Sequence, residues 1–173
     1  KCSGIVVLGL YALSQRAIFV GLGLLFSAAG DVFLELDGLF VAGMGAFGLA
    51  HVFYTAAFVG IIRREGLNKS GWPFAVAVLA ASITLGVWFA PSQAEMGLAI
   101  PATAYSVIIS IMVMSAFMSK APLMAKLGAV IFMLSDTLIA IGMFAKQPVP
   151  IGSVWITYAG AQIMLAWSLS RRT

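Results

Sequence analysis

Long apolar stretches separated by short polar breaks dominate this chain. Seven of them approach or reach the roughly 20 residues that a helix needs to cross the hydrocarbon core of a bilayer. The breaks contain the Pro, Gly, Ser and charged residues that are typical of turns. Helices are favoured over strands because the apolar positions do not alternate with period two and because backbone groups in lipid need internal hydrogen bonds. We predict helices at 2–14, 16–35, 38–62, 72–90, 97–118, 122–145 and 151–170.

The composition places this chain among membrane proteins. Of its 173 residues, 62% are hydrophobic and 9% are charged, whereas a soluble domain carries about 25% charged residues. There are too few polar side chains to cover a surface that faces water. We therefore expect an all-α integral membrane protein, a polytopic bundle of seven spanning helices that forms a single domain over residues 1–173.

Basic residues mark one side of the predicted membrane path. Eight of the ten Lys and Arg residues fall on this side, scattered in small groups: Arg16, Arg63, Arg64, Lys69, Lys120, Lys126, Arg171 and Arg172. By the positive-inside rule this side is cytoplasmic, so the C-terminus is expected inside and residue 1 outside. No basic stripe suited to nucleic acid is present.

The sequence favours neither a disulfide nor a metal centre. Cys2 is the only cysteine, which excludes an internal disulfide and a thiolate cluster. A single histidine makes a zinc site a weak hypothesis. We assign no metal and no organic cofactor, although a metal held by carboxylates alone stays open. The segments of a cleavable signal peptide do not occur in the required order.

Two carboxylates lie inside predicted spanning helices, at Asp31 and Asp136. Both lie about 20 Å from the cytoplasmic ends of their helices, at 1.5 Å per residue, and can therefore share one depth in the membrane. The helices place no Lys or Arg at that depth. An ionisable residue inside a spanning segment is costly and is a functional-site hypothesis by default. His51 lies near the middle of the third helix, and Tyr54 lies one turn away on the same face.

Other polar side chains fall in the same band of the membrane. They are Tyr105, Tyr158 and Gln162, together with Glu35, one turn after Asp31, and Ser135, beside Asp136. A structural interpretation exists for each of them. A membrane histidine or glutamine often joins two helices by a hydrogen bond, and single tyrosines more often pack or lie at the interface. Glu35 has a simpler interpretation as a solvated loop acid, as does Asp37.

The chemistry expected of the two aspartates is acid–base catalysis. Two carboxylates in a pocket of low dielectric repel each other, so one of them is expected to hold its proton near neutral pH. A general acid beside a general base is the arrangement that cleaves acetal-like bonds through an oxocarbenium-like state. A small transporter or proton-coupled channel is the main alternative, because buried Asp and His residues also mark proton relays. A non-catalytic lipid-binding protein is a third possibility.

Short motifs along nearly the whole chain resemble the YhhN family, whose animal members include lysoplasmalogenase. The resemblance rests on four groups of residues: Ala29-Gly30-Asp31 with Leu34, Phe40, Gly43, Phe47, His51, Tyr54 and Phe58; Pro101 and Tyr105 with Ile109 and Met112; Gly128-Ala129, Phe132, Ser135-Asp136 and Phe144; and Tyr158-Ala159 with Ala161-Gln162. Cys2 departs from the family pattern, which commonly has Pro after the preceding lysine. Members usually have about eight spanning helices, so Lys1 is expected to open the second, with an eighth helix before it.

The resemblance implies hydrolysis of the vinyl-ether bond of lysoplasmalogen to a fatty aldehyde and a glycerophospho-base. Asp31 and Asp136 would share the roles of acid and base, and His51 would orient or relay a proton. Tyr54, Tyr158 and Gln162 would position water or the glycerol oxygens, and Tyr105, Glu35 and Ser135 are further substrate-binding candidates. The lysophospholipid would enter from the bilayer, without a cofactor. Compact loops and Ala- and Gly-rich helices favour a bacterial inner membrane. The true substrate and the oligomeric state stay open.

Overall fold

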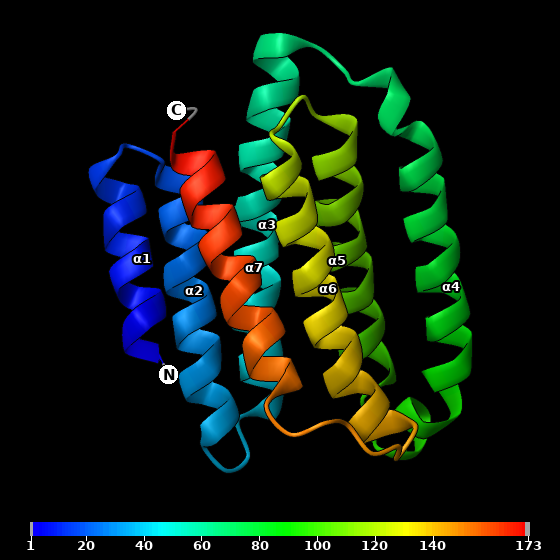
Figure 1. Cartoon of the computed structure of the whole chain (residues 1–173). Helices are drawn as coiled ribbons and strands as arrows, with labels where there is room; N and C mark the ends of the chain where they lie inside the picture. The colour runs from blue at the N-terminus through cyan, green and yellow to red at the C-terminus, as the bar shows by residue number, and fades with distance from the viewer. Residues whose placement is uncertain (1, 172–173) are drawn as a thin grey trace.

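The computed structural model describes residues 2–171, and every regular element in this part of the chain is helical (Figure 1). Seven α-helices and one short 3-10 turn, η1, are present. This confirms the predicted helical bundle. Five of the helices, α2 to α6, are long and apolar enough to cross a membrane, while α1 is a shorter apolar helix. The elements are α1 Cys2–Ser14, α2 Ile18–Glu35, α3 Phe40–Glu65, η1 Lys69–Gly71, α4 Trp72–Glu95, α5 Ala99–Met118, α6 Leu123–Phe144 and α7 Ser153–Ser170.

Successive helices run in opposite directions, so their connections alternate between the two ends of the bundle (Figure 1). We call the end with the α1–α2, α3–α4 and α5–α6 connections the basic end, and the opposite end the acidic end. Helices α1, α2, α3, α5, α6 and α7 contact one another in a closed ring, with α7 returning to α1 and α2. Helix α4 lies outside this ring, where it packs mainly on α5.

Helix α4 is longer than the sequence predicts. The break expected at Pro91 is absent, and the helix continues through this proline to Glu95. A proline inside a helix removes one backbone hydrogen bond and usually kinks or ends the helix. In a membrane-spanning helix it is tolerated, because local adjustments and neighbouring helices satisfy the freed groups. The extra turn brings Gln93 into the bundle, where it is buried.

Two glycines let α2 approach the aromatic side chains of α3. A Cβ atom at Gly23 would lie 2.7 Å from the ring of Tyr54, and a Cβ atom at Gly30 would lie 2.6 Å from the ring of Phe47. Real Cβ atoms do not come so close to another heavy atom. Small residues at helix contacts allow backbones to approach closely in membranes, where van der Waals packing replaces the hydrophobic effect. Gly23 and Gly30, the latter directly before Asp31, therefore leave space for two aromatic rings of α3.

The connection between α3 and α4 is anchored to the end of α5. Asn68 donates from its backbone nitrogen to the Met118 carbonyl at 2.8 Å and from its side chain to the Phe117 carbonyl at 3.0 Å. Lys120 donates to the carbonyl of Glu65 at 2.6 Å. These bonds hold α4 near α5 at the basic end.

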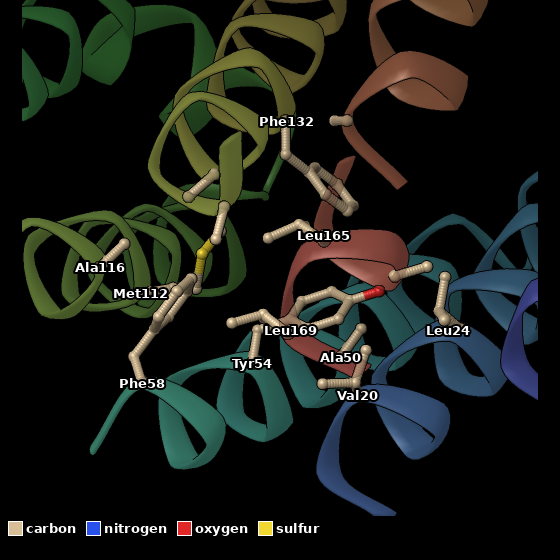
Figure 2. Packing of buried hydrophobic residues seen from close by; sticks show 14 of the residues in the cluster. Val20, Leu24, Ala50, Tyr54, Phe58, Met112, Ala116, Phe132, Leu165 and Leu169 are labelled. Carbon is tan, nitrogen blue, oxygen red and sulfur yellow. The ribbon is translucent and has the colours of Figure 1, made fainter. Parts of the chain in front are cut away.

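The buried core joins α2, α3, α5, α6 and α7. Figure 2 shows Tyr54 between Leu24 of α2 and Leu165 and Leu169 of α7, with Phe132 close by. All four of its neighbours are at most 2% exposed, and Tyr54 has no exposed surface. A polar hydroxyl is thus placed inside an otherwise apolar core.

Candidate active site

A cavity of about 450 Å³ lies between the helices in the half of the bundle nearer the acidic end. Its size falls in the range of about 300–1,000 Å³ that is usual for small-molecule sites. Helices α2 to α7 all contribute to its walls. Six of the predicted site residues line it, namely Asp31, Glu35, Tyr105, Ser135, Asp136 and Tyr158. Glu35 and Gly152 are exposed, so the cavity reaches the surface at the acidic end.

Asp136 lies in a cluster with a tyrosine and the histidine. The Tyr105 hydroxyl donates a short hydrogen bond of 2.5 Å to Asp136 Oδ2. The Nε2 atom of His51 lies 2.9 Å from the same hydroxyl and 3.4 Å from Asp136 Oδ2. The three side chains come from α3, α5 and α6, so the cluster joins three helices.

Tyr105 is the centre of this cluster. Its hydroxyl donates to Asp136 Oδ2 and is within hydrogen-bond distance of His51 Nε2. When the Tyr105 proton lies on the Asp136 side, the contact with His51 requires the tautomer that is protonated at Nε2. The other ring nitrogen, Nδ1, is buried and has no hydrogen-bond partner among the described residues. The cluster thus connects the buried ring of His51 to Asp136 at the cavity wall.

Asp31 lies in a second cluster that reaches into the core. Tyr158 donates to Asp31 Oδ2 at 2.9 Å, and these residues come from α7 and α2. One turn further along α7, Gln162 accepts a 2.6 Å hydrogen bond from the hydroxyl of Tyr54. Gln162 has no exposed surface. The amide oxygen of Gln162 is thus satisfied, while its buried amide nitrogen has no hydrogen-bond partner among the described residues.

Phe132 separates and positions the two clusters. Its ring is fully buried and makes edge-on contacts with His51 at 4.7 Å, Tyr158 at 5.5 Å and Tyr54 at 6.4 Å between ring centroids. Phe47 packs edge-on against both Tyr158 at 5.9 Å and Phe132 at 6.3 Å, so the three rings form one cluster. Edge-to-face packing of this kind is favourable and orients the rings.

The predicted site residues therefore form two layers. Asp31, Glu35, Tyr105, Ser135, Asp136 and Tyr158 face the cavity, while His51, Tyr54 and Gln162 lie buried and outside its lining. The Ser135 hydroxyl donates to the backbone carbonyl of Val154 at 3.0 Å, which ties α6 to α7. The buried residues His51, Tyr54 and Gln162 can orient the acids and tyrosines that line the cavity.

Sequence reasoning missed the contribution of α4. One face of this helix lines the cavity through Ser82, Leu85, Gly86, Phe89 and Gln93. The spacing of these residues is that of a single helical face. No buried charge marked this helix in the sequence, and the break predicted at Pro91 separated Gln93 from it. Phe132 was also missed as a site residue, because a phenylalanine in an apolar helix carries no signal of its own.

The described residues offer no group of three or more His, Cys, Asp or Glu side chains that could hold a metal ion. The acids and the histidine are instead paired with tyrosines, as described above. The arrangement suits proton transfer to and from a bound molecule.

Fold and site together define a polytopic helical membrane protein with two carboxylates on the wall of one intramembrane cavity. The chain matches the YhhN family over residues 1–169, so it belongs to this family.

Several curated proteins are similar to this chain. It is 36% identical over 147 residues to a lysoplasmalogenase of Mycobacterium bovis, which covers 82% of this chain and 56% of that protein. It is 33% identical over 152 residues to lysoplasmalogenase TMEM86B of Sus scrofa, and the match covers 86% of this chain and 62% of that protein. It is 33% identical over 168 residues to lysoplasmalogenase TMEM86A of Homo sapiens, and the match covers 90% of this chain and 65% of that protein. The chain thus spans somewhat more than half the length of these relatives. No solved structure matches it.

Proposed function

We propose that this protein is a membrane-embedded hydrolase that cleaves the vinyl-ether bond of a lysoplasmalogen. One observation carries the proposal: Asp31 and Asp136 line a single cavity, and each accepts a hydrogen bond from a tyrosine that lines it too. The similarity to proteins named lysoplasmalogenase supports this choice of substrate.

The proposed reaction uses one carboxylic acid and one carboxylate. The acid transfers its proton to the β-carbon of the vinyl ether, which leaves an oxocarbenium ion at the carbon bonded to oxygen. The carboxylate removes a proton from water as the water oxygen attacks that carbon. The resulting hemiacetal collapses when its hydroxyl proton moves to the glycerol oxygen and the carbon–oxygen bond breaks. The products are a fatty aldehyde and a glycerophospho-base.

The surrounding residues would position these two acids. Tyr105 and His51 hold Asp136 at the cavity wall, and Tyr158 holds Asp31. A pre-oriented acid and base can supply a large part of the rate acceleration, because geometry is prepared before the reaction begins. The products need no redox change, and we propose a reaction without an organic cofactor.

The shape of the cavity favours this proposal over transport. Its deepest lining residues, Ser82, Ile109 and Met133, lie near the middle of α4, α5 and α6. A transporter needs a path that reaches both faces of the membrane. Another hollow lies separately at the basic end and is lined in part by Arg16 and Arg64.

We further propose that the basic end faces the cytoplasm of a bacterial cell, in its inner membrane, with the C-terminus inside. This follows from the positive-inside rule applied to the connections at that end. The cavity would then reach the surface on the outer side.

The test is hydrolysis of lysoplasmalogen by the purified protein, with aldehyde and glycerophospho-base measured by mass spectrometry. We expect Asp31→Asn and Asp136→Asn to lower turnover by about 100- to 10,000-fold, the usual effect of losing a general acid or base. Asp37→Asn is the matched control, since Asp37 is an exposed acid of the α2–α3 connection and is not part of the lining. Folded Asn variants that both keep wild-type turnover would show that the carboxylate mechanism is wrong.

The fate of solvent atoms tests the mechanism separately. In deuterated water the aldehyde should gain one deuterium beside its carbonyl carbon, because that carbon accepts the catalytic proton. In water labelled with heavy oxygen, the glycerophospho-base should stay unlabelled, because water attacks the vinyl carbon. Label in the glycerophospho-base would contradict the proposed bond cleavage.

A further inference from the structure

The cavity has a polar part and an apolar part, and they lie at different depths. At 1.5 Å per residue, Asp31 lies about 6 Å and Asp136 about 12 Å from the helix ends at the acidic end. By the same measure Ile109, Met133 and Ser82 lie about 15–20 Å from that end. All five residues line one cavity. The ionisable residues of the lining therefore lie nearer the acidic end than Ile109, Met133 and Ser82 do.

The deep part is an apolar arm between α4, α5 and α6. Its walls are formed by Leu85 of α4, Ile109 of α5 and Met133 of α6. Helix α4 packs mainly on α5 and only lightly on α6, so the arm lies along the looser side of the bundle. Exposed apolar residues cover the outer surface of α4, including Ile83 and Val87. A hydrocarbon chain in this arm would contact mainly apolar side chains, with Ser106 and Ser135 as polar neighbours, until it met the floor.

Ser82 forms the floor of this arm together with its partner on α5. Ser110 is buried, and its hydroxyl lies 2.7 Å from the Ser82 hydroxyl and 2.5 Å from the Ser106 carbonyl oxygen, so the two serines join α4 to α5. Ser82 itself donates to the Val78 carbonyl, one turn earlier, at 2.9 Å. Its hydroxyl is thus satisfied by protein groups, and its small side chain leaves space above it.

We propose that this arm holds the hydrocarbon chain of the lysolipid and that Ser82 at its floor limits the length of chain the enzyme accepts. The inference rests on the proposed function, because the carboxylates would act where the head group meets the chain. A lipid in the outer leaflet has its head group at the surface and its chain toward the midplane. The polarity of the cavity follows the same order, so a single-chain lipid can enter without turning over.

The test replaces Ser82 by a larger side chain and measures hydrolysis of lysoplasmalogens with short, medium and long chains. Ser82→Phe should lower kcat/KM for the longest chain at least tenfold relative to the shortest. Thr84→Phe is the matched control, because Thr84 makes the same bond to the carbonyl four residues earlier, at 2.9 Å, but is exposed and outside the lining. Met133→Phe, from the opposite wall at a similar depth, should shift the preference in the same direction.

A second readout does not depend on catalysis. Lysolipids with a saturated ether chain resist vinyl-ether hydrolysis, and their binding can be measured as a shift of the thermal midpoint in nanodiscs. The wild-type protein should be stabilised most by long chains, and this advantage should disappear in Ser82→Phe. An unchanged chain preference in Ser82→Phe, or an equal change in Thr84→Phe, overturns the inference. A wild-type protein that shows the preference without hydrolysing any lysoplasmalogen supports the arm and overturns the proposed function.

Discussion

The hydroxyl of Tyr105 is the part of the site whose removal is most informative. It shares a hydrogen bond of 2.9 Å with His51 Nε2 and donates one of 2.5 Å to Asp136 Oδ2. Tyr105→Phe removes both bonds and keeps the ring, which packs edge-on against His51 at 5.4 Å. The substitution therefore separates the role of the hydroxyl from that of the aromatic contact.

The expected loss of stability from Tyr105→Phe is small. Hydrogen bonds between membrane helices contribute about 0.6 kcal/mol each on average, so two lost bonds lower the free energy of unfolding by about 1 kcal/mol. His51 Nε2 lies 3.4 Å from Asp136 Oδ2 and can move closer once the hydroxyl is gone. Stability in detergent should consequently stay close to that of the wild type.

The expected loss of activity from Tyr105→Phe is larger. Displacing a catalytic group by about 1 Å can lower the rate about 100-fold, which corresponds to about 2.7 kcal/mol of transition-state stabilisation. The assay is kcat/KM for lysoplasmalogen, with the thermal midpoint of the same preparation. Tyr11→Phe on α1 is the control, because Tyr11 is outside the cavity lining.

A double-mutant cycle tests whether His51 acts through Tyr105. If His51 acts on Asp136 through the hydroxyl, His51→Leu should lower kcat/KM much less in the Tyr105→Phe background than in the wild type. Strictly additive effects would refute the relay. A Tyr105→Phe protein with wild-type kcat/KM would refute the positioning of Asp136 by this tyrosine.

Two other predictions concern the fold and its orientation. Gly71→Ala should lower the free energy of unfolding by about 3 kcal/mol or more, because the new Cβ would lie 2.0 Å from the Phe117 carbonyl oxygen. Gly45→Ala is the control, because its new Cβ meets nothing within 4 Å. Equal thermal midpoints of Gly71→Ala and Gly45→Ala would contradict the close contact of η1 with α5. Reporter domains inserted in the α5–α6 connection should be active in the cytoplasm, and those in the α4–α5 connection should be active outside. The reverse pattern would show that the positive-inside assignment is wrong.

Much of the architecture was predictable because lipid restricts the possible structures. A spanning segment must satisfy its own backbone, so apolar length alone indicates helices, and the predicted ranges match the observed helices closely. Pro91 is the exception, since the bundle tolerates a proline that would end most helices in water. The buried acids were also visible in the sequence, because few charged residues occur in spanning helices.

Only the tertiary structure decided which polar groups meet. The depth of a residue along its helix follows from its residue number. The rotation of each helix about its axis and the choice of its neighbours depend on packing. Here α3 packs against α5, while α4 lies outside the ring of helices. The sequence brought Asp31, His51 and Asp136 to similar depths, and the structure separated them into two clusters linked by Phe132. The face of α4 that lines the cavity could not be read from its sequence, because a helix that is apolar on all sides shows no preferred direction.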